Sequence, residues 1–339
     1  MGDAMNSQLY TTDAAWTSID LADKRWIHVL ESDELRELYR AAKSLPDDES
    51  AWLDLTRDDF DLPKLNPLFD RANEELERGR GLCLLRGIEL RGDRDFAYRV
   101  NWVLALGLGS VIAQNANGEV IGAVEAVVQA TDNGADTRGY VSNAELRFHC
   151  DGGDVASLLC VRQAPEGGLS SLVSMVSIHN TMLKECPHHL EVLYQGLKIY
   201  MRAENGLESA VSERPLPIFM PQDDGLLAFI NLRLMELVYE AQNEDMPADK
   251  RAALDAFEEI AERPEHKFSF KLEPGDLLLT HNFTCMHKRA SFVDDPDPEK
   301  SRLMLRLWYN IPGGRVEAIQ PADQRAGYFT QAPYVIRSQ

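Results

Sequence analysis

The sequence predicts an α+β fold in which an antiparallel sandwich or barrel of strands is covered on the outside by helices. Apolar residues recur at helical spacing in the first third of the 339-residue chain. From about residue 140, short β-favouring runs are separated by turns that contain Gly and Pro. The pattern is not a βαβ alternation, and neither GxGxxG nor GxxxxGK followed by Ser or Thr occurs, so nucleotide binding has no motif to support it.

The first third of the chain is expected to be mainly helical. Helical spacing and turn residues predict helices over 32–45, 66–79 and 95–107, and a buried strand over 81–87. Ser32 suits the N-cap of the first helix. Asn66 and Pro67 suit the N-cap and the first helical position of the second.

Strands and helices of different lengths follow in the second part of the chain. Strands are predicted in the segments 144–151, 156–164, 171–176, 267–282 and 301–311. Helices are predicted over 177–185, 187–196, 231–242 and 247–262. We therefore expect one domain over 1–339, made of a helical N-terminal region (1–80), core strands (81–175 and 266–315) and a largely helical insertion (176–265).

Composition excludes several classes of protein. With 44% hydrophobic and 27% charged residues, the chain has an ordinary globular composition. Its 35 basic and 55 acidic residues give a net charge of −20, which opposes binding to nucleic acid or an anionic membrane. No apolar run approaches membrane-spanning length, and the N-terminal segment lacks the apolar region of a secretory signal. Five scattered cysteines without a CxxC pair suggest reduced thiols and a cytoplasmic location.

His149 and Asp151 lie two residues apart in a strand-like segment. Their side chains should share one face, with Cys150 on the other. An imidazole and a carboxylate at this spacing can share a metal, and a distant second histidine would complete a 2-His-1-carboxylate triad with open positions on Fe(II). His281 and His287 are the candidates for that histidine. By itself the pair is a weak signal, because a core histidine followed by a turn acid looks the same.

Two arginines on one strand face indicate an anion nearby. Arg302 and Arg306 share the face of Trp308 in an otherwise apolar strand, where an unpaired charge is costly. A guanidinium suits a two-point grip on a carboxylate, although the acidic run 294–299 is an alternative partner. Ser170 follows a Gly-Gly turn, where its hydroxyl either assists a carboxylate or is an ordinary strand hydroxyl.

Together these motifs resemble those of the Fe(II)/2-oxoglutarate-dependent dioxygenases. The order is His-x-Asp, then Gly-Gly-x-Ser about twenty residues later, then a distal His followed by an Arg. More narrowly, the chain resembles the taurine dioxygenase (TauD/TfdA) group, including its clavaminate synthase-like members. The resemblance covers roughly residues 80–315, with little signal in 1–65 or 320–339. It implies a double-stranded β-helix, or jelly roll, with flanking helices.

The resemblance assigns roles to individual residues. HKRASF matches the family's His-x-Arg-x-x-Phe stretch, so the implied iron ligands are His149, Asp151 and His287. His281 falls where the family usually has Asn or Asp, and its role stays open. Arg302, fifteen residues after His287, matches the Arg that binds the far carboxylate of 2-oxoglutarate. Ser170 matches the Thr or Ser that assists it.

The implied activity is oxidation of a C–H bond with Fe(II), 2-oxoglutarate and O₂, releasing succinate and CO₂. Asp151 favours hydroxylation, because the family's halogenating members lack the carboxylate ligand. Desaturation and cyclisation use the same ligands. Two alternatives are a zinc hydrolase built on the same residues and a catalytically silent jelly-roll binding protein.

The substrate is predicted only as a class. Arg306 matches a second Arg that lies near the substrate in several members, which suggests a small metabolite with an anionic group, such as an amino acid or a derivative. Gln114 and Asn117, in a polar segment before the metal strand, and Arg233 are further candidates for substrate contact. A polar hairpin loop is the alternative for the first two. Homo-oligomers are common in the family, so self-association fits the resemblance.

Overall fold

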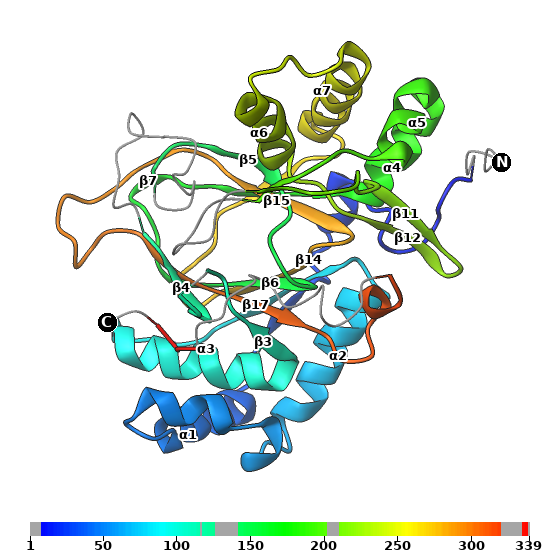
Figure 1. Cartoon of the computed structure of the whole chain (residues 1–339). Helices are drawn as coiled ribbons and strands as arrows, with labels where there is room; N and C mark the ends of the chain where they lie inside the picture. The colour runs from blue at the N-terminus through cyan, green and yellow to red at the C-terminus, as the bar shows by residue number, and fades with distance from the viewer. Residues whose placement is uncertain (1–7, 116, 126–141, 202–209, 320–333, 338–339) are drawn as a thin grey trace.

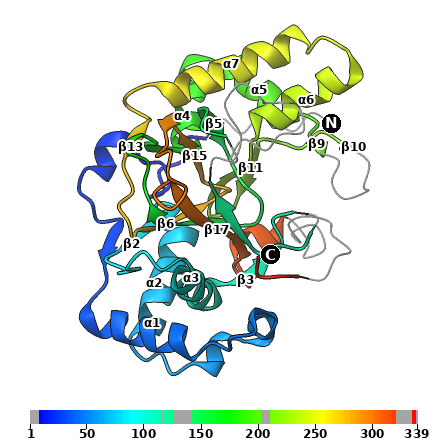
Figure 2. The same ribbon diagram turned by 90° about the vertical axis from the view of Figure 1, so that its left-hand side faces the viewer.

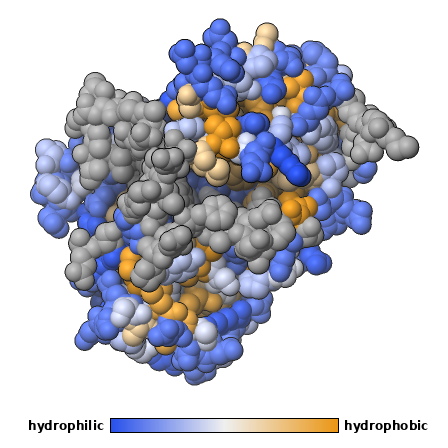
Figure 3. All heavy atoms as spheres, in the orientation of Figure 1, coloured by the Kyte–Doolittle hydropathy of each residue, from blue (hydrophilic) through white to orange (hydrophobic). Residues whose placement is uncertain are grey.

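The computed structural model describes residues 8–115, 117–125, 142–201, 210–319 and 334–337. Two β-sheets face each other and helices cover their outer faces, as the two perpendicular views show (Figures 1 and 2). The expected α+β jelly roll is thereby confirmed. Among the coloured residues in Figure 3 hydrophilic ones predominate, and hydrophobic residues gather in a few patches between them. No helix in the described ranges combines the length and the apolar character needed to cross a bilayer.

The larger sheet lies against the helices of the N-terminal region. Its strands are, in order, β1 (Ile27–Val29), β2 (Leu82–Arg86), β14 (Leu277–His281), β6 (Val155–Arg162), β17 (Leu303–Asn310) and β3 (Ser110–Ile112), with β4 (Ile121–Val124) also paired to β17. Only β1 and β2 pair in parallel. The covering helices are α1 (Ser32–Ser44), α2 (Leu65–Glu77) and α3 (Arg94–Leu108). Leu38, Phe69 and Trp102 from these helices form one core with Leu305 of β17.

The smaller sheet lies under the helices of the insertion. Its strands are antiparallel in the order β13 (Phe268–Phe270), β8 (Ser170–Ser174), β15 (Cys285–Arg289) and β5 (Leu146–His149). The helices above it are α4 (Met175–Glu185), α5 (Pro187–Gln195), α6 (Leu232–Gln242) and α7 (Ala248–Glu262). Phe148, Val173 and Met286 of this sheet share a second core with the helices.

The insertion also contains short strands that its helical pattern does not reveal. They are β9 (Tyr200–Met201) with β10 (Ala210–Val211), and β11 (Phe219–Gln222) with β12 (Gly225–Ala228). A further small pair joins β7 (Glu166–Gly167) to β16 (Phe292–Val293). Four 3₁₀ helices are described at Ser18–Leu21, Glu49–Asp54, Arg57–Asp59 and Arg315–Ala318.

Both predicted N-caps in the first third are wrong by one or more residues. The N-cap of α1 is Glu31, whose side chain and that of Glu34 form a reciprocal capping box, so Ser32 is already helical. Helix α2 starts at Leu65 because Glu37 of α1 accepts hydrogen bonds from the first backbone N–H groups, those of Lys64 and Leu65. A side chain from another helix replaces the local cap that the sequence suggested.

Strand alternation decides which side chains enter the space between the sheets. Along β17, Leu303, Leu305, Leu307 and Tyr309 join the core against α1–α3. Arg302 and Arg306 point the other way and line a cavity between the sheets. In β5 one extra residue forms a bulge, since His287 opposes His149 whereas Arg289 opposes Leu146. The bulge turns both Leu146 and His149 into the cavity.

Candidate metal centre and adjoining cavity

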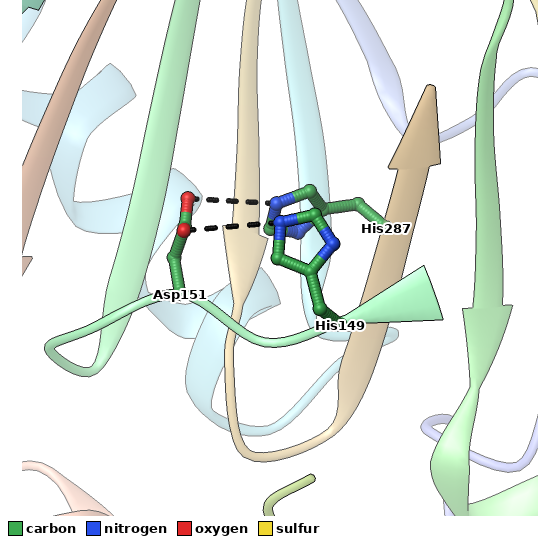
Figure 4. Close-up of side chains that lie close together, drawn as sticks. All are labelled: His149, Asp151 and His287. Carbon is green, nitrogen blue, oxygen red and sulfur yellow. Dashed lines mark ion pairs between the residues drawn. The ribbon is translucent and has the colours of Figure 1, made fainter. Parts of the chain in front are cut away.

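Three predicted ligands converge at one end of the cavity. His149 ends β5, Asp151 follows in the turn, and His287 lies opposite His149 on β15. One potential ligand atom from each lies within 4.8 Å of the others (Figure 4). Asp151 Oδ2 is 3.5 Å from His287 Nε2, and Asp151 Oδ1 is 3.9 Å from His149 Nε2. No other group of three or more His, Cys, Asp or Glu side chains in the described part of the chain is arranged in this way.

The turn that carries Asp151 is held by Asn282. The amide oxygen of Asn282 accepts from the Asp151 backbone N–H at 3.1 Å, and its nitrogen donates to the carbonyls of Gly152 and Gly153 at 3.0 and 3.1 Å. A Cβ at Gly152 would lie 2.8 Å from the Trp308 ring, so this turn needs a glycine. Asn282 was not predicted, and its position directly after β14 gave only a weak signal.

The tautomer of His149 suits metal binding. Its Nδ1 lies 2.8 Å from the carbonyl oxygen of Arg147, so Nδ1–H donates there and Nε2 offers its lone pair toward Asp151. Burial, together with the neighbouring His287, lowers the pKa of His149 to about 4. The imidazole is therefore neutral at pH 7, the form in which it can bind a metal.

Asp151 supplies the negative charge of the group. Burial alone would raise the pKa of this carboxyl, but the Arg306 guanidinium and the two imidazoles hold it well below its usual range. An ionised carboxylate with two histidines is the donor set of non-haem Fe(II) oxygenases. The chemistry of these three side chains therefore fits an Fe(II) ion, with the cavity side of the group open to further ligands.

Ion pairs anchor the strands that carry His149 and His287 to the helical cover. Arg147 of β5 bonds Glu236 of α6 at 2.9 Å and Glu258 of α7 at 2.6 Å. Lys288 of β15 bonds Glu262 of α7 at 2.5 Å and Glu145 at 2.6 Å. Arg147 and Lys288 thus hold the two strands against α6 and α7, while His149 and His287 face the cavity.

Arg306 is paired within the chain. Its Nη1 lies 3.3 and 3.4 Å from the Asp151 oxygens, and its Nε donates to Gln114 Oε1 at 2.7 Å. Gln114 is buried and donates in turn to the carbonyls of Val120 and Arg306, both at 2.7 Å. The structure therefore places Gln114 behind Arg306 rather than on the cavity wall, and the partner of Arg306 is Asp151 rather than the acidic run 294–299.

Arg302 has no such partner. Its side chain is buried, lines the cavity with Ser170, and leaves Nε and Nη1 without a hydrogen bond. Burial lowers the pKa of Arg302 to about 10. From the acidic run, Asp294 accepts from the backbone N–H of Arg302 at 2.7 Å. These orphaned donors fit the carboxylate of a bound organic acid such as 2-oxoglutarate.

Arg289 is a further buried arginine on the cavity wall, and it was not predicted as a site residue. Its Nη2 donates to the carbonyls of Ser142, at 2.7 Å, and Ala144, while Nε and Nη1 have no partner. Burial lowers the pKa of Arg289 to about 9, and the nearby charge of Arg302 acts in the same direction. The HKRASF stretch contained this residue, but the pattern gave it no role.

Three other candidates lie apart from the triad. Asn117 is exposed in a turn, where its backbone N–H donates to Asn115 at 3.0 Å. Arg233 is exposed in α6 and pairs with Glu240. His281 is buried at the end of β14, with Nε2 3.3 Å from Glu77. None of the three lines the cavity, and His281 does not belong to the metal-binding group.

Comparison with known proteins agrees with this arrangement. A family model described as taurine catabolism dioxygenase TauD, TfdA family, matches residues 43–308. FR-33289 synthase of Streptomyces rubellomurinus is 33% identical over 310 residues, covering 90% of this chain and 91% of the relative. Taurine hydroxylase-like protein SAT17 of Stachybotrys chartarum is 28% identical over 274 residues, covering 75% and 67%.

Solved structures share the fold at low sequence identity. An asparagine oxygenase in complex with Fe(II), 2S,3S-3-hydroxyasparagine and succinate is 16% identical and has a TM-score of 0.66, over 89% of this chain and 98% of that one. The non-haem iron oxygenase OrfP with Fe and α-ketoglutaric acid is 15% identical and has a TM-score of 0.64, over 91% and 99%. These findings do not favour a zinc hydrolase or a silent binding protein.

Proposed function

The chain belongs to the taurine dioxygenase TauD/TfdA family, and we propose that His149, Asp151 and His287 hold its catalytic iron. It is an Fe(II)- and 2-oxoglutarate-dependent dioxygenase. The bound iron supplies the oxidising chemistry, in which 2-oxoglutarate and O₂ are consumed and succinate and CO₂ are released. Convergence of the three ligands on a cavity that also contains an unpaired arginine is the observation that carries the proposal.

The protein's own residues prepare the iron ligands. Arg147 fixes the His149 tautomer through its carbonyl oxygen, and Asn282 fixes the turn of Asp151. Arg306, held by Gln114, keeps Asp151 ionised and limits the rotation of its carboxylate. Such outer contacts orient metal ligands and tune their basicity.

The far carboxylate of 2-oxoglutarate is assigned to Arg302 and Ser170. Both line the cavity that begins at the metal ligands. A guanidinium left unpaired in a buried site carries a large desolvation cost, and a carboxylate brought by the cosubstrate would remove it. This assignment leaves the opposite, keto-acid end of the molecule directed toward the metal.

We propose that the substrate is a small metabolite with an anionic group, such as an amino acid or a derivative. Three guanidinium groups line the cavity, those of Arg289, Arg302 and Arg306, against the single carboxylate of Asp151. The charges of Fe(II) and of the 2-oxoglutarate dianion cancel each other. The excess positive charge of the cavity would therefore persist with both bound and would attract an anion. The amino acid products in the asparagine oxygenase and OrfP structures support this class. Hydroxylation is the proposed outcome.

Substrate contacts are assigned by position. Arg306 would meet the anionic group from its place beside Asp151 on the cavity wall. Arg233 stands in the first turn of α6, and the residue that caps this helix, Asn231, bridges to His149. Arg233 and Asn117 stay substrate-contact candidates from the sequence, and neither lines the cavity. Gln114 would act on the substrate only through Arg306.

The wider organisation is proposed on the same grounds. Strands from residues 81–175 and 266–315 interleave within each sheet, which supports one oxygenase domain over 1–339. The insertion covers the strands that carry both histidines. The cytoplasmic location and self-association stay predictions from the sequence.

The first test combines spectroscopy and turnover. Anaerobic Fe(II) and 2-oxoglutarate should give a weak visible metal-to-ligand charge-transfer band, and a screen of amino acids and related acids should release succinate in step with product. His149→Ala should abolish both signals, and Arg302→Ala should weaken 2-oxoglutarate binding. Intact Fe(II) binding without the band would contradict the proposed site. An unchanged 2-oxoglutarate affinity in Arg302→Ala would overturn the role of Arg302.

A further inference from the structure

Strand register places Arg289 at the cosubstrate end of the cavity. Arg289 and His287 are two residues apart on β15, so their side chains share the face that looks into the cavity. Arg289 is also directly opposite Ser170 across the β15–β8 pair, and directly opposite residues project on the same face. The arginine therefore stands next to the hydroxyl that is assigned to the far carboxylate of 2-oxoglutarate.

Arg289 and Arg302 approach this position from different sheets. Arg289 comes from the end of β15, and Arg302 directly precedes β17. Their guanidinium carbons lie 4.8 and 5.2 Å from the centroid of the same ring, that of Phe292. The aromatic ring thus fixes both planar groups in one small region.

The guanidinium groups of Arg289 and Arg302 both have N–H donors without a hydrogen-bond acceptor. Nε and Nη1 of each arginine are buried without a hydrogen-bond partner. Arg289 uses Nη2 for the carbonyls of Ser142 and Ala144, and the nearby Asp294 is bonded to the backbone N–H of Arg302. Two like charges at low dielectric repel each other unless an anion lies between them.

We propose that Arg289 is a second guanidinium arm of the site for the distal carboxylate of 2-oxoglutarate. This inference rests on the proposed cosubstrate site at Arg302. A carboxylate has two oxygens with about four acceptor positions, enough to receive N–H groups from both arginines and the hydroxyl of Ser170. Arg289 acts in binding and positioning, and it links the cosubstrate to the carbonyls of Ser142 and Ala144, just ahead of the metal strand β5.

The competing explanation is that Arg289 only braces the chain before β5. Two cosubstrates separate these roles, because 2-oxopentanoate has the keto-acid end and the chain length of 2-oxoglutarate but lacks the distal carboxylate. If Arg289 contacts the distal carboxylate, its substitution weakens the binding of 2-oxoglutarate only. If Arg289 only braces the chain, its substitution weakens the binding of both acids equally. Arg162→Gln is a matched control, since Arg162 also donates to loop carbonyls, those of Ser301 and Pro298, but does not line the cavity.

Equilibrium binding of both acids to the anaerobic Fe(II) protein, measured by calorimetry, tests the proposal without turnover. Arg289→Gln should weaken 2-oxoglutarate binding by about tenfold to a hundredfold and 2-oxopentanoate binding by less than about threefold. Arg289→Lys, which keeps the charge, should recover part of the loss. Iron content and thermal unfolding of each variant check that it folds. Arg162→Gln should leave both affinities unchanged.

The outcomes separate the two proposals. Equal weakening of both acids in Arg289→Gln, or no weakening of either, would overturn the role of Arg289. If the unaltered protein binds iron but not 2-oxoglutarate, the proposed function itself is wrong. If Arg302→Gln loses affinity for 2-oxoglutarate and Arg289→Gln does not, only the inference about Arg289 fails.

Discussion

Arg302 and Arg306 point into one cavity from the same face of one strand, four residues apart, yet their surroundings differ. Arg306 is paired with Asp151 and held by Gln114. Arg302 is also buried but leaves two of its nitrogens unpartnered. A guanidinium whose charge is balanced inside the protein can orient its partner, whereas one without a partner requires an external anion. The contrast supports the proposed division of the cavity into a metal end, at Asp151 and Arg306, and a cosubstrate end, at Arg302.

The two sheets contribute to these ends in different ways. Both histidines come from the smaller sheet, which α6 and α7 hold through Arg147 and Lys288. Arg306 belongs to β17 of the larger sheet and Arg302 directly precedes it, and the opposite face of β17 lies in the apolar core against α1–α3. His149 and His287 are thus positioned by a different layer from Arg302, so substitution of Arg302 should leave the proposed metal ligands measurably intact.

The largest effect is expected at the metal end. His149→Ala removes one of three ligands, so iron content should fall below stoichiometry and turnover should drop by at least about a thousandfold. Metal analysis and succinate release measure the two effects. His188→Ala, which removes an exposed histidine of α5, should retain full iron and activity. Stoichiometric iron in the His149→Ala protein would show that the ligand set is wrong.

Arg302→Gln should produce the next largest effect, confined to the cosubstrate end. Loss of a charge-assisted contact to a buried carboxylate corresponds to about a tenfold to hundredfold rise in the KM for 2-oxoglutarate. Iron content should stay unchanged, because Arg302 does not contact the triad. A variant that lost its iron instead would show that the two ends are not separable.

The sequence predicted much of this division. The spacing of His149, Asp151 and His287 and the resemblance to the family predicted the three side chains that the structure brings together. Alternation along β17 predicted that Arg302 and Arg306 face inward, because a period of two is fixed by strand geometry. What it did not predict was their different partners. Asp151 meets Arg306 only after β17 pairs with β6, across 155 residues of chain.

Residues whose side chains bond the backbone of other segments were also missed. Asn282 holds the turn of Asp151 by bonding three backbone groups, and Arg289 donates to two carbonyls. No side-chain pattern marks such contacts in a sequence. Strand β15 was not predicted either. Its residues Cys-Met-His-Lys-Arg are buried or partly buried, and they lack the clear alternation of apolar and polar types that marks a strand in a sequence.

The pH dependence of the iron-free protein should sharpen the contrast between the ends. Folding lowers the pKa of His149 from 6.5 to about 4. As the pH falls, this imidazole is therefore protonated in the unfolded chain before it is protonated in the folded protein. Stability is therefore lost as the pH falls from about 6.5 toward 4. Between pH 7 and 5, the free energy of unfolding should fall by about 2 kcal/mol more in the unaltered protein than in His149→Gln. Denaturant unfolding of both proteins without metal measures the difference, and equal slopes would contradict the lowered pKa.

The smallest effect is expected from Gln114→Leu, which disturbs Arg306 without touching any proposed ligand. The substitution removes the acceptor of Arg306 Nε and the donor to two buried carbonyls, so stability should fall by about 1–3 kcal/mol. A less well oriented Arg306 should lower kcat by about threefold to tenfold, while the affinity for 2-oxoglutarate stays the same. Thermal unfolding, steady-state turnover and anaerobic binding measure these three quantities. A loss of 2-oxoglutarate affinity comparable to that of Arg302→Gln would mean that the two arginines serve one end of the cavity, and the division between them would have to be abandoned.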